Sequence, residues 1–464
     1  MAESATTSLA AATPAPEGVT ERINRAAVEA LAAGEPKWLR ERRLEAWATY
    51  ERTPMPTTRL EEWRYTNLAR MLRLGRLAPV ARAPRTVGPA GAARAATNGA
   101  AIPPALARAV EGDRAASGHL LEIEGSVARV DLLDELAAKG VVLASLRDAV
   151  ESHGELLERI LAVEALPATA GKFQALNAAL WTDGILLVVP KGVRMELPVR
   201  ATRWYSNPGL AHFSRTLVVA EPGSRVSFVD ESLSADFPEQ ALVSSAVEVF
   251  ARDGAQIQYV SLQRLGKGAF HLAQQRTLAG RDATLDTLNL SFGASVSRVD
   301  LTAELRGPGA NSDMLGLYFG DGNQHFDHNT RQDHIAPNTK SDLLYKGALD
   351  GHARAVFRGI IRVHKGAQQT DAYQTNRNLL LSEHARADSL PNLEIEADDV
   401  KCSHGATVGE LDPEHLFYLM SRGLPRAQAE RLVVMGFLGE VLSRLPLGGV
   451  VEKVTGIIES RLHG

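Results

Sequence analysis

Cysteine is almost absent from this sequence. Cys402 is the single cysteine among 464 residues, so no disulfide can form within the chain, which fits a reducing compartment. A lone thiolate also excludes a zinc site or metal cluster built from the cysteines of this chain alone. Any such site would need ligands from other residue types or from another chain.

The sequence also lacks long hydrophobic runs and a large net charge, and its aromatic residues are few. No apolar run approaches the roughly 20 residues of a membrane span. The net charge is −4 and aromatic residues make up 5%, so nothing in the balance indicates a nucleic-acid partner. Residues 1–18, rich in Ala, Thr and Pro, predict a disordered tail and not a signal peptide. A cytoplasmic protein without a membrane partner is therefore expected.

The hydrophobic pattern divides the rest of the chain into three parts. Residues 19–183 read as a mostly helical domain with a flexible segment at 78–104, rich in Ala, Gly, Pro and Arg. Short β-patterned runs separated by turns fill residues 184–405. Residues 406–464 return to helical spacing. The fold class predicted is mainly β with helical ends.

The turns of the β region share a form. Three of them begin at Pro190, Glu221 and Arg252, 31 residues apart each time, and carry glycine near their centre. Strand–turn units without intervening helices are typical of a solenoid, in which each coil buries its face against its neighbours. A β-sandwich would also give many short strands. The solenoid is favoured because more than 200 residues of strand are too many for one simple sandwich.

The end of the β region carries the clearest candidate ligands. The run D-D-V-K-C-S-H-G at 398–405 places His404 two residues after Cys402. In an extended strand these two side chains project from the same face, and both are ligands for soft and borderline metals. The alternative is a buried, inert cysteine beside a hydrogen-bonded histidine.

A second polar cluster lies upstream. On one strand His325 and Asp327 would share a face while His328 points the other way, so one ion could bind all three only at a bend. Hydrogen bonding or interface contacts are favoured over a metal site. Residues 266–268, G-K-G, are too short for a phosphate-binding loop, and no ATP site is expected.

Apolar side chains near both ends of the chain must be buried against other surfaces. Trp63 and Tyr65 lie close together and are interpreted as packing anchors. The C-terminal helices carry apolar stripes. These helices dock either on the solenoid of this chain or on a partner.

A long ordered motif points to a family. The run D-D-V-K-C-S-H-G-A-T-V-G at 398–409, followed by L-F-Y-L-M-S-R-G at 416–423, resembles the C-terminal signature of the SufB/SufD family, the scaffold subunits of the SUF iron–sulfur cluster assembly machinery. Further matching segments are 325–330, 356–359, 378–382, 391–395 and, more weakly, E-E-W-R-Y-T at 61–66. In having a single cysteine, and in Gly405 and the pair Val408-Gly409, the sequence resembles the SufD branch of that family.

The resemblance implies a right-handed parallel β-helix between helical domains. It implies a non-catalytic scaffold that pairs with a SufB-type subunit through the β-helix and with a SufC-type ATPase through the C-terminal helices. The residues that the resemblance marks for ATPase docking are Phe417, Tyr418, Arg422, Phe437 and Leu438. A transient iron–sulfur cluster would form at the interface with the SufB-type subunit, with His404 and Cys402 as the ligand candidates of this chain.

Two other functions compete with the scaffold. One is a β-helix enzyme acting on polysaccharide, and the other is a homodimeric scaffold that works without a SufB-type subunit. The sequence leaves open the cluster type, the route of iron, and whether a reduced flavin binds the complex.

Overall fold

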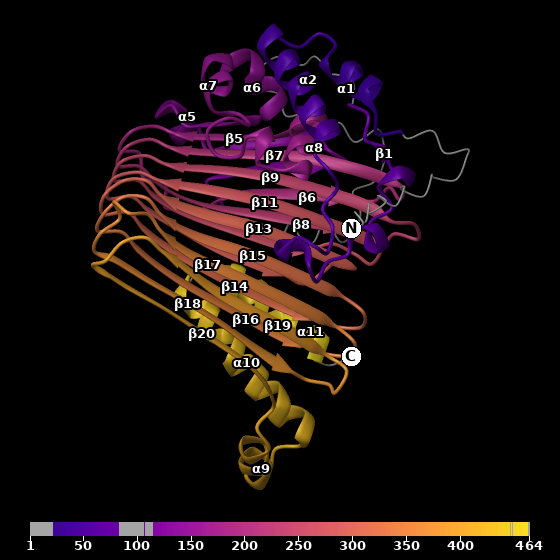
Figure 1. The fold of residues 1–464 in the computed structure, drawn as a ribbon, viewed down its shortest axis with the longest axis vertical. Coiled ribbons are helices and arrows are strands. Elements are labelled where there is room, and N and C mark those ends of the chain that lie inside the picture. The colour runs from indigo at the N-terminus through magenta and orange to yellow at the C-terminus, as the bar shows by residue number, and fades with distance from the viewer. Residues whose placement is uncertain (1–21, 83–105, 107–114, 446, 448, 463–464) are drawn as a thin grey trace, which may run out of the picture.

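The strand-and-turn region folds into a β-solenoid in the computed structural model, which describes residues 22–82, 106, 115–445, 447 and 449–462 (Figure 1). The expected tail at 1–18 lies outside the described residues, as does the expected flexible segment apart from residues 78–82. Successive strands alternate between two parallel sheets, so each coil adds one strand to each sheet. The predicted parallel β-helix is confirmed.

Sheet A contains the odd-numbered strands of the solenoid and sheet B the even-numbered ones. The strands of sheet A are β5 (Asp183–Val189), β7 (Leu210–Ala220), β9 (Ala241–Ala251), β11 (Ala269–Ala279), β13 (Val296–Leu305), β15 (His325–His334), β17 (Arg354–Val363) and β19 (Arg386–Ile395). Those of sheet B are β6 (Val199–Tyr205), β8 (Arg225–Ser234), β10 (Gln256–Arg264), β12 (Thr284–Ser291), β14 (Asn311–Gly320), β16 (Lys340–Leu349), β18 (Thr370–Leu380) and β20 (Val400–Glu410).

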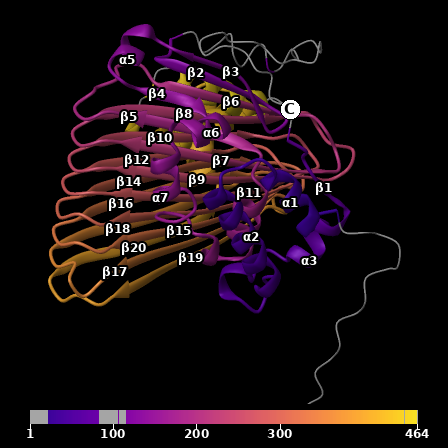
Figure 2. The same cartoon turned by 90° about the horizontal axis from the view of Figure 1, so that it is seen from above.

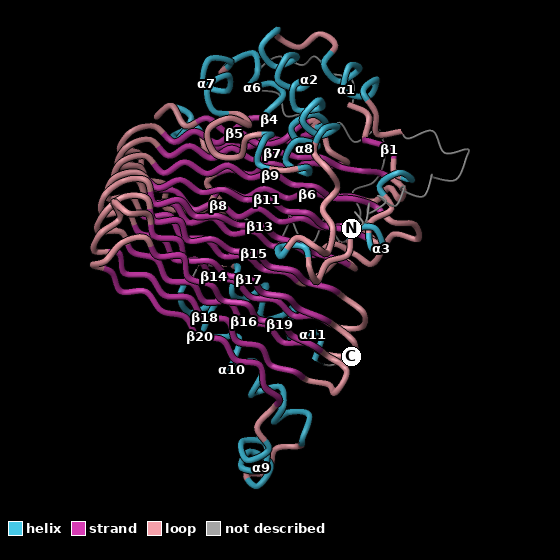
Figure 3. Tube along the Cα trace, viewed as in Figure 1, coloured by secondary structure: helices cyan, strands magenta, loops and turns pink. Residues whose placement is uncertain are grey.

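The repeated turns stack one above the next along the side of the solenoid (Figures 2 and 3). Gly223 and Gly254 occupy equivalent places in neighbouring coils with φ of 70° and 68°, a left-handed conformation that glycine adopts without steric cost. The amide of Gly223 donates to the carbonyl of Asp253 at 3.0 Å. The 31-residue spacing in the sequence is therefore the length of one coil.

The N-terminal part contributes both helices and strands. Strands β2 (Gly118–Ile123) and β3 (Ser126–Leu132) extend sheet B, β4 (Val142–Ser145) extends sheet A, and β1 (Ala78–Pro79) pairs with β7. The helices are α1 (Arg25–Ala32), α2 (Lys37–Arg52), η1 (Glu61–Trp63), α3 (Leu68–Met71), η2 (Leu74–Arg76), α5 (Asp134–Ala138), α6 (Leu146–Ser152), α7 (Gly154–Ile160), η3 (Ala168–Ala170) and α8 (Lys172–Leu180). Most of their buried apolar residues form one cluster with those of sheet A, whereas Leu136 of α5 packs in a second cluster.

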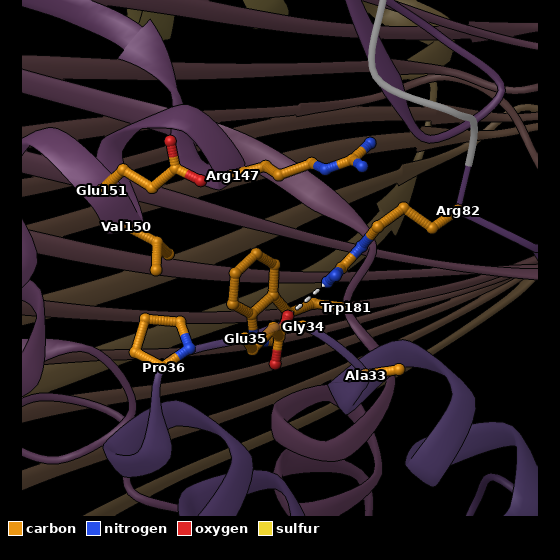
Figure 4. A pocket seen from close by; sticks show the side chains of 9 residues that line it. All are labelled: Ala33, Gly34, Glu35, Pro36, Arg82, Arg147, Val150, Glu151 and Trp181. Carbon is orange, nitrogen blue, oxygen red and sulfur yellow. Dashed lines mark hydrogen bonds and ion pairs between the residues drawn. The ribbon is translucent and has the colours of Figure 1, made fainter.

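A small cavity of about 120 Å³ lies within the N-terminal part, between the α1–α2 connection, α6 and the residue that follows α8 (Figure 4). Arg82 reaches across it and pairs with Glu35 at 2.6 Å. Glu35 also pairs with Arg43 at 2.7 Å, and Arg43 is fully buried over the ring of Trp181. These ion pairs tie the α1–α2 connection to the end of α8.

The C-terminal helices are α9 (Pro413–Ser421), α10 (Arg426–Arg444) and α11 (Val450–Leu462). Of these, α10 and α11 pack on the outer face of sheet B, whereas α9 contacts α10 and stands away from the sheets (Figure 1). Val441 and Val454, on α10 and α11, belong to one buried cluster with Leu290 and Leu317 of sheet B. Lys346 of β16 donates to the carbonyl of Phe437 at 2.8 Å. The α10–α11 hairpin thus docks on its own solenoid, and within the described residues no helix is both long and apolar enough to span a membrane.

Four buried histidines are held neutral by the interior of the protein. They are His212, His271, His328 and His334, and burial lowers the pKa of each from 6.5 to about 4. His328 stacks on Tyr318 with ring centroids 4.7 Å apart, and Nδ1 of His271 lies 2.9 Å from Oγ of Ser297. Protonating any of them would place a charge in the interior.

Replacing His271 by asparagine is expected to flatten the dependence of stability on pH. The folded-state pKa lies below the unfolded one, so the neutral ring contributes stability above pH 6.5 that is lost as pH falls toward 4. Between pH 7 and pH 5 the wild type should lose about 1–2 kcal/mol more than the variant. Urea unfolding at both pH values measures this, and equal losses in the two proteins would contradict the prediction.

Candidate functional site

The last coil of the solenoid presents two open strand edges. Strand β19 pairs with β17 and β20 pairs with β18, while no strand in the described part of the chain covers their other edges. Both strands lie at the end of the stack opposite the N-terminal helices (Figure 1). Exposed edges offer a row of free N–H and C=O groups and are sites where another chain can pair.

Cys402 and His404 lie on β20, so the expected extended conformation is confirmed. They stand opposite Ala372 and Gln374 of β18. Residues two apart in a strand share a face, and Ala372 and Gln374 are both buried inside the preceding coil. Cys402 and His404 therefore lie on the inner face of β20, at the open end of the solenoid.

The two candidate ligands differ in environment. Cys402 is partly buried beside Ala372 and Ala397, and burial raises the pKa of its thiol. His404 is exposed. The thiol therefore stays protonated near neutral pH until a cation or metal approaches, whereas the imidazole is open to a ligand or to another chain.

Two side chains do not complete a metal site. Among the residues that the structure describes, no group of three or more His, Cys, Asp or Glu side chains could hold an ion. Iron–sulfur clusters are held mainly by four thiolates, with histidine as a known replacement. The open end can supply one or two ligands, and a facing chain would have to supply the rest.

Apolar side chains surround this end. Leu393 and Ile395 on β19 are 37% and 41% exposed, and Val408 on β20 is 44% exposed. On strands deeper in the solenoid the corresponding positions are buried, as at Ile361 and Val363. Sequence reasoning missed these three residues because the strand pattern does not show that no further coil covers them.

The second polar cluster is divided by the sheet. His325 and Asp327 face outward and both contact Thr66, whose Oγ1 lies 2.9 Å from Nε2 of His325. His328 is on the inner side, stacked on Tyr318. The three side chains do not converge on one point, and they take part in hydrogen bonding and packing, the interpretation favoured over a metal site.

The motif E-E-W-R-Y-T packs on that same outer face, as the interpretation of Trp63 as an anchor predicts. The ring of Trp63 is buried, with the guanidinium of Arg298 3.7 Å from its centroid. Arg298 also pairs with Asp327 at 2.6 Å. The weakly matching N-terminal segment is thus bound to sheet A by contacts between residues more than 200 positions apart.

The candidate ATPase-docking residues separate into two groups. Phe417 and Tyr418 on α9 are 74% and 57% exposed, and the guanidinium of Arg422 lies 5.2 Å from the Tyr418 ring. Leu438 is fully buried against sheet B, and Phe437 is partly buried beside Lys346. In this conformation α9 offers an accessible apolar surface, and the last two residues do not belong to it.

Comparison with known proteins gives a consistent result. A family model described as the SUF system FeS cluster assembly SufBD core domain matches residues 203–437, and one for the SufBD protein N-terminal region matches residues 120–201. Iron–sulfur cluster assembly protein SufD of Bacillus subtilis is 32% identical over 92% of this chain and 95% of its own length. SufB of the same organism is 27% identical over 75% of this chain and 74% of its own length. An iron–sulfur cluster assembly SufBD family protein of Staphylococcus saprophyticus is 28% identical over 75% of this chain and 74% of its own length. The similarity to SufD spans nearly the whole of both chains.

Proposed function

The chain belongs to the SufB/SufD family of iron–sulfur cluster assembly proteins, and from that premise we propose that it is a scaffold subunit whose open solenoid end forms a cluster-building interface with a SufB-type partner. The observation that carries this proposal is the coincidence of two features on β20: a free strand edge and the pair Cys402 and His404.

The free edges support pairing with a chain of similar fold. Strands β19 and β20 are 10 and 11 residues long and run parallel to their neighbours. A partner that ends in equally long strands would continue both sheets and cover the exposed Leu393, Ile395 and Val408. Main-chain hydrogen bonds would supply affinity, and the apolar rim would exclude water from the junction.

The ligand pair supports a cluster shared between subunits. With one thiol in this chain, the partner would supply most of the thiolates. A nascent cluster is cargo that must leave, and a site divided between two chains opens when the chains separate. His404 is the stronger ligand candidate because it is exposed, whereas the Cys402 thiol is half-buried with a raised pKa.

The same proposal assigns the energy-using step to another subunit. A SufC-type ATPase would bind the exposed face of α9 around Phe417, Tyr418 and Arg422. Helix α9 is connected directly to β20, so force applied there would reach the strand that carries the ligands. In this arrangement the chain is not itself an enzyme, and its low cysteine content fits the cytoplasm.

Replacing His404 by alanine is expected to remove most of the cluster from an intact complex. The test is to co-express the chain with SufB-type and SufC-type partners, purify without oxygen, and measure iron and acid-labile sulfide. His384→Ala, an exposed histidine at a turn, serves as the matched control. The subunit ratio must be equal in all three complexes before the contents are compared.

Retention of wild-type iron and sulfide by the His404→Ala complex would contradict a ligand role. The histidine would then be an interface residue, and the ligands would come from the partner. Failure of the wild-type chain to associate with a SufB-type partner at all would overturn the shared interface itself.

A further inference from the structure

A groove of about 580 Å³ lies on the opposite side of sheet A from the solenoid interior. Its floor is the outer face of β11, β13, β15 and β17, and its walls are residues 53–63 and 170–174 of the N-terminal part. Sites for small organic ligands are typically of this size. One lining residue, Glu394, lies on β19 of the proposed cluster interface, and the other lining residues lie outside that interface.

The floor presents two parallel rows of polar side chains. Gln274, Asp300, Asn329 and Arg358 stand opposite one another on successive strands. Two residues further along each strand the next row contains Arg276, Thr302 and Arg331. Neighbouring strands lie about 4.8 Å apart, so the arginines of both rows converge on a patch the width of a few strands.

The arginines of this patch keep unused donors. Arg331 makes no ion pair with any described residue, and Arg358 reaches only the exposed Glu61 at 3.4 Å. Arg276 is bound to Glu304 at 2.6 Å, yet its Nε, like that of Arg358, is buried with no acceptor. Asp300 on the floor is occupied by Arg298 at 2.8 Å.

Charges of both signs meet at the groove. Five basic residues line it, Lys172 and four arginines, together with three acidic residues, Glu62, Asp300 and Glu394. Three of the arginines are paired with carboxylates, Arg276 with Glu304, Arg298 with Asp300 and Asp327, and Arg358 with Glu61. Among the described residues no carboxylate pairs with Arg331, so the positive charge that is not neutralised lies at its guanidinium.

Helix α8 begins in the wall of the same groove. Its N-cap, Gly171, has no side chain to accept a hydrogen bond, and the amides of Phe173 and Gln174 have no acceptor among the described residues. The positive end of the helix dipole and such free amides favour an anion. Gln274 on the floor is 3% exposed and its carboxamide oxygen has no hydrogen-bond partner, so it can accept from a hydroxyl group of a ligand but does not contact the anionic group.

We propose that this groove binds a small organic oxyanion, a phosphate or carboxylate compound, between the start of α8 and the guanidinium groups of Arg331 and Arg358. The anionic part would accept hydrogen bonds from the arginines and the free amides. Pro54, Pro56 and Leu60 form an apolar wall that would contact the carbon skeleton. Neither a cluster nor a partner chain is required for this binding.

Isothermal titration of the purified full chain tests the proposal, with inorganic pyrophosphate and citrate as separate probes. At least one probe should bind at a single saturable site, and added salt should weaken it. Arg331→Gln should weaken binding by about tenfold or more, because a charge-assisted hydrogen bond is lost. Arg281→Gln changes an exposed arginine at a distant turn and should leave binding unchanged. If Arg331→Gln does not fold, Arg358→Gln replaces it.

The two probes separate the sources of the anion. Binding of pyrophosphate alone indicates a phosphate ligand, binding of citrate alone indicates a carboxylate ligand, and binding of both indicates the shared chemistry. The absence of saturable binding with both probes overturns the proposal, as does equal weakening by Arg331→Gln and Arg281→Gln or no weakening by either. These results bear on the groove and not on the interface at β20.

Discussion

Replacing Glu248 by glutamine lowers the free energy of unfolding by about 3–5 kcal/mol, because it leaves the guanidinium of Arg215 buried without its counter-charge. The two side chains are fully buried on neighbouring strands β7 and β9, with Nη2 of Arg215 2.6 Å from Oε1 of Glu248. In a low-dielectric interior an unpaired charge costs far more than the same charge at the surface.

The carboxylate of Glu248 also joins two parts of the fold. It accepts hydrogen bonds from the amides of Ala162 and Leu166 at 3.1 Å and 3.2 Å, while Arg215 reaches Oδ1 of Asn177 in α8 at 3.2 Å. The change therefore weakens the junction between the helical domain and the first coils in addition to the ion pair.

Urea unfolding of wild type and Glu248→Gln measures this loss. Glu29→Gln is the matched control, because Glu29 pairs with Arg25 at 2.8 Å in a setting where both side chains are more than half exposed. There the same change should cost no more than about 0.5 kcal/mol. Losses of similar size at the two sites would show that the buried pair has no special importance.

Replacing Val408 by glutamate is expected to weaken association with the SufB-type partner by about 100-fold, equivalent to about 2.8 kcal/mol. Val408 lies on the apolar rim beside the open edge of β20 and is 44% exposed in the isolated chain. In the proposed complex it would be covered, and an unpaired carboxylate would be buried there. The isolated variant should keep wild-type stability, because the side chain is already open to water.

Surface-immobilised partner and purified variants allow the dissociation constants to be compared. Val163→Glu is the matched control: it makes the same substitution at a residue of similar exposure, 46%, in the N-terminal part. Unchanged affinity of Val408→Glu would exclude the open end as the binding surface. A homodimer formed through the same edges would also be broken by this variant, and light scattering on the isolated chain detects it.

Much of the architecture followed from local pattern. The 31-residue spacing of the early turns equals the length of the first coils, because residues 31 apart pair on neighbouring strands there. The period of two in a strand placed Cys402 and His404 on one face before any contact was known. The ordered motif at 398–423 indicated the family, which the matches to SufBD models and to SufD confirmed.

The sequence by itself thus determined the solenoid, the family and the shared face of the two candidate ligands, because each depends on neighbours along the chain. Only the tertiary structure decided which strand ends the stack, that Leu438 turns inward, and that Thr66 meets His325 and Asp327. It also brought Gly171 and Arg331 to one groove. These contacts join residues that are far apart in the sequence. They depend on how the whole fold buries apolar surface and pairs charges, which cannot be predicted from the residues that neighbour each one along the chain.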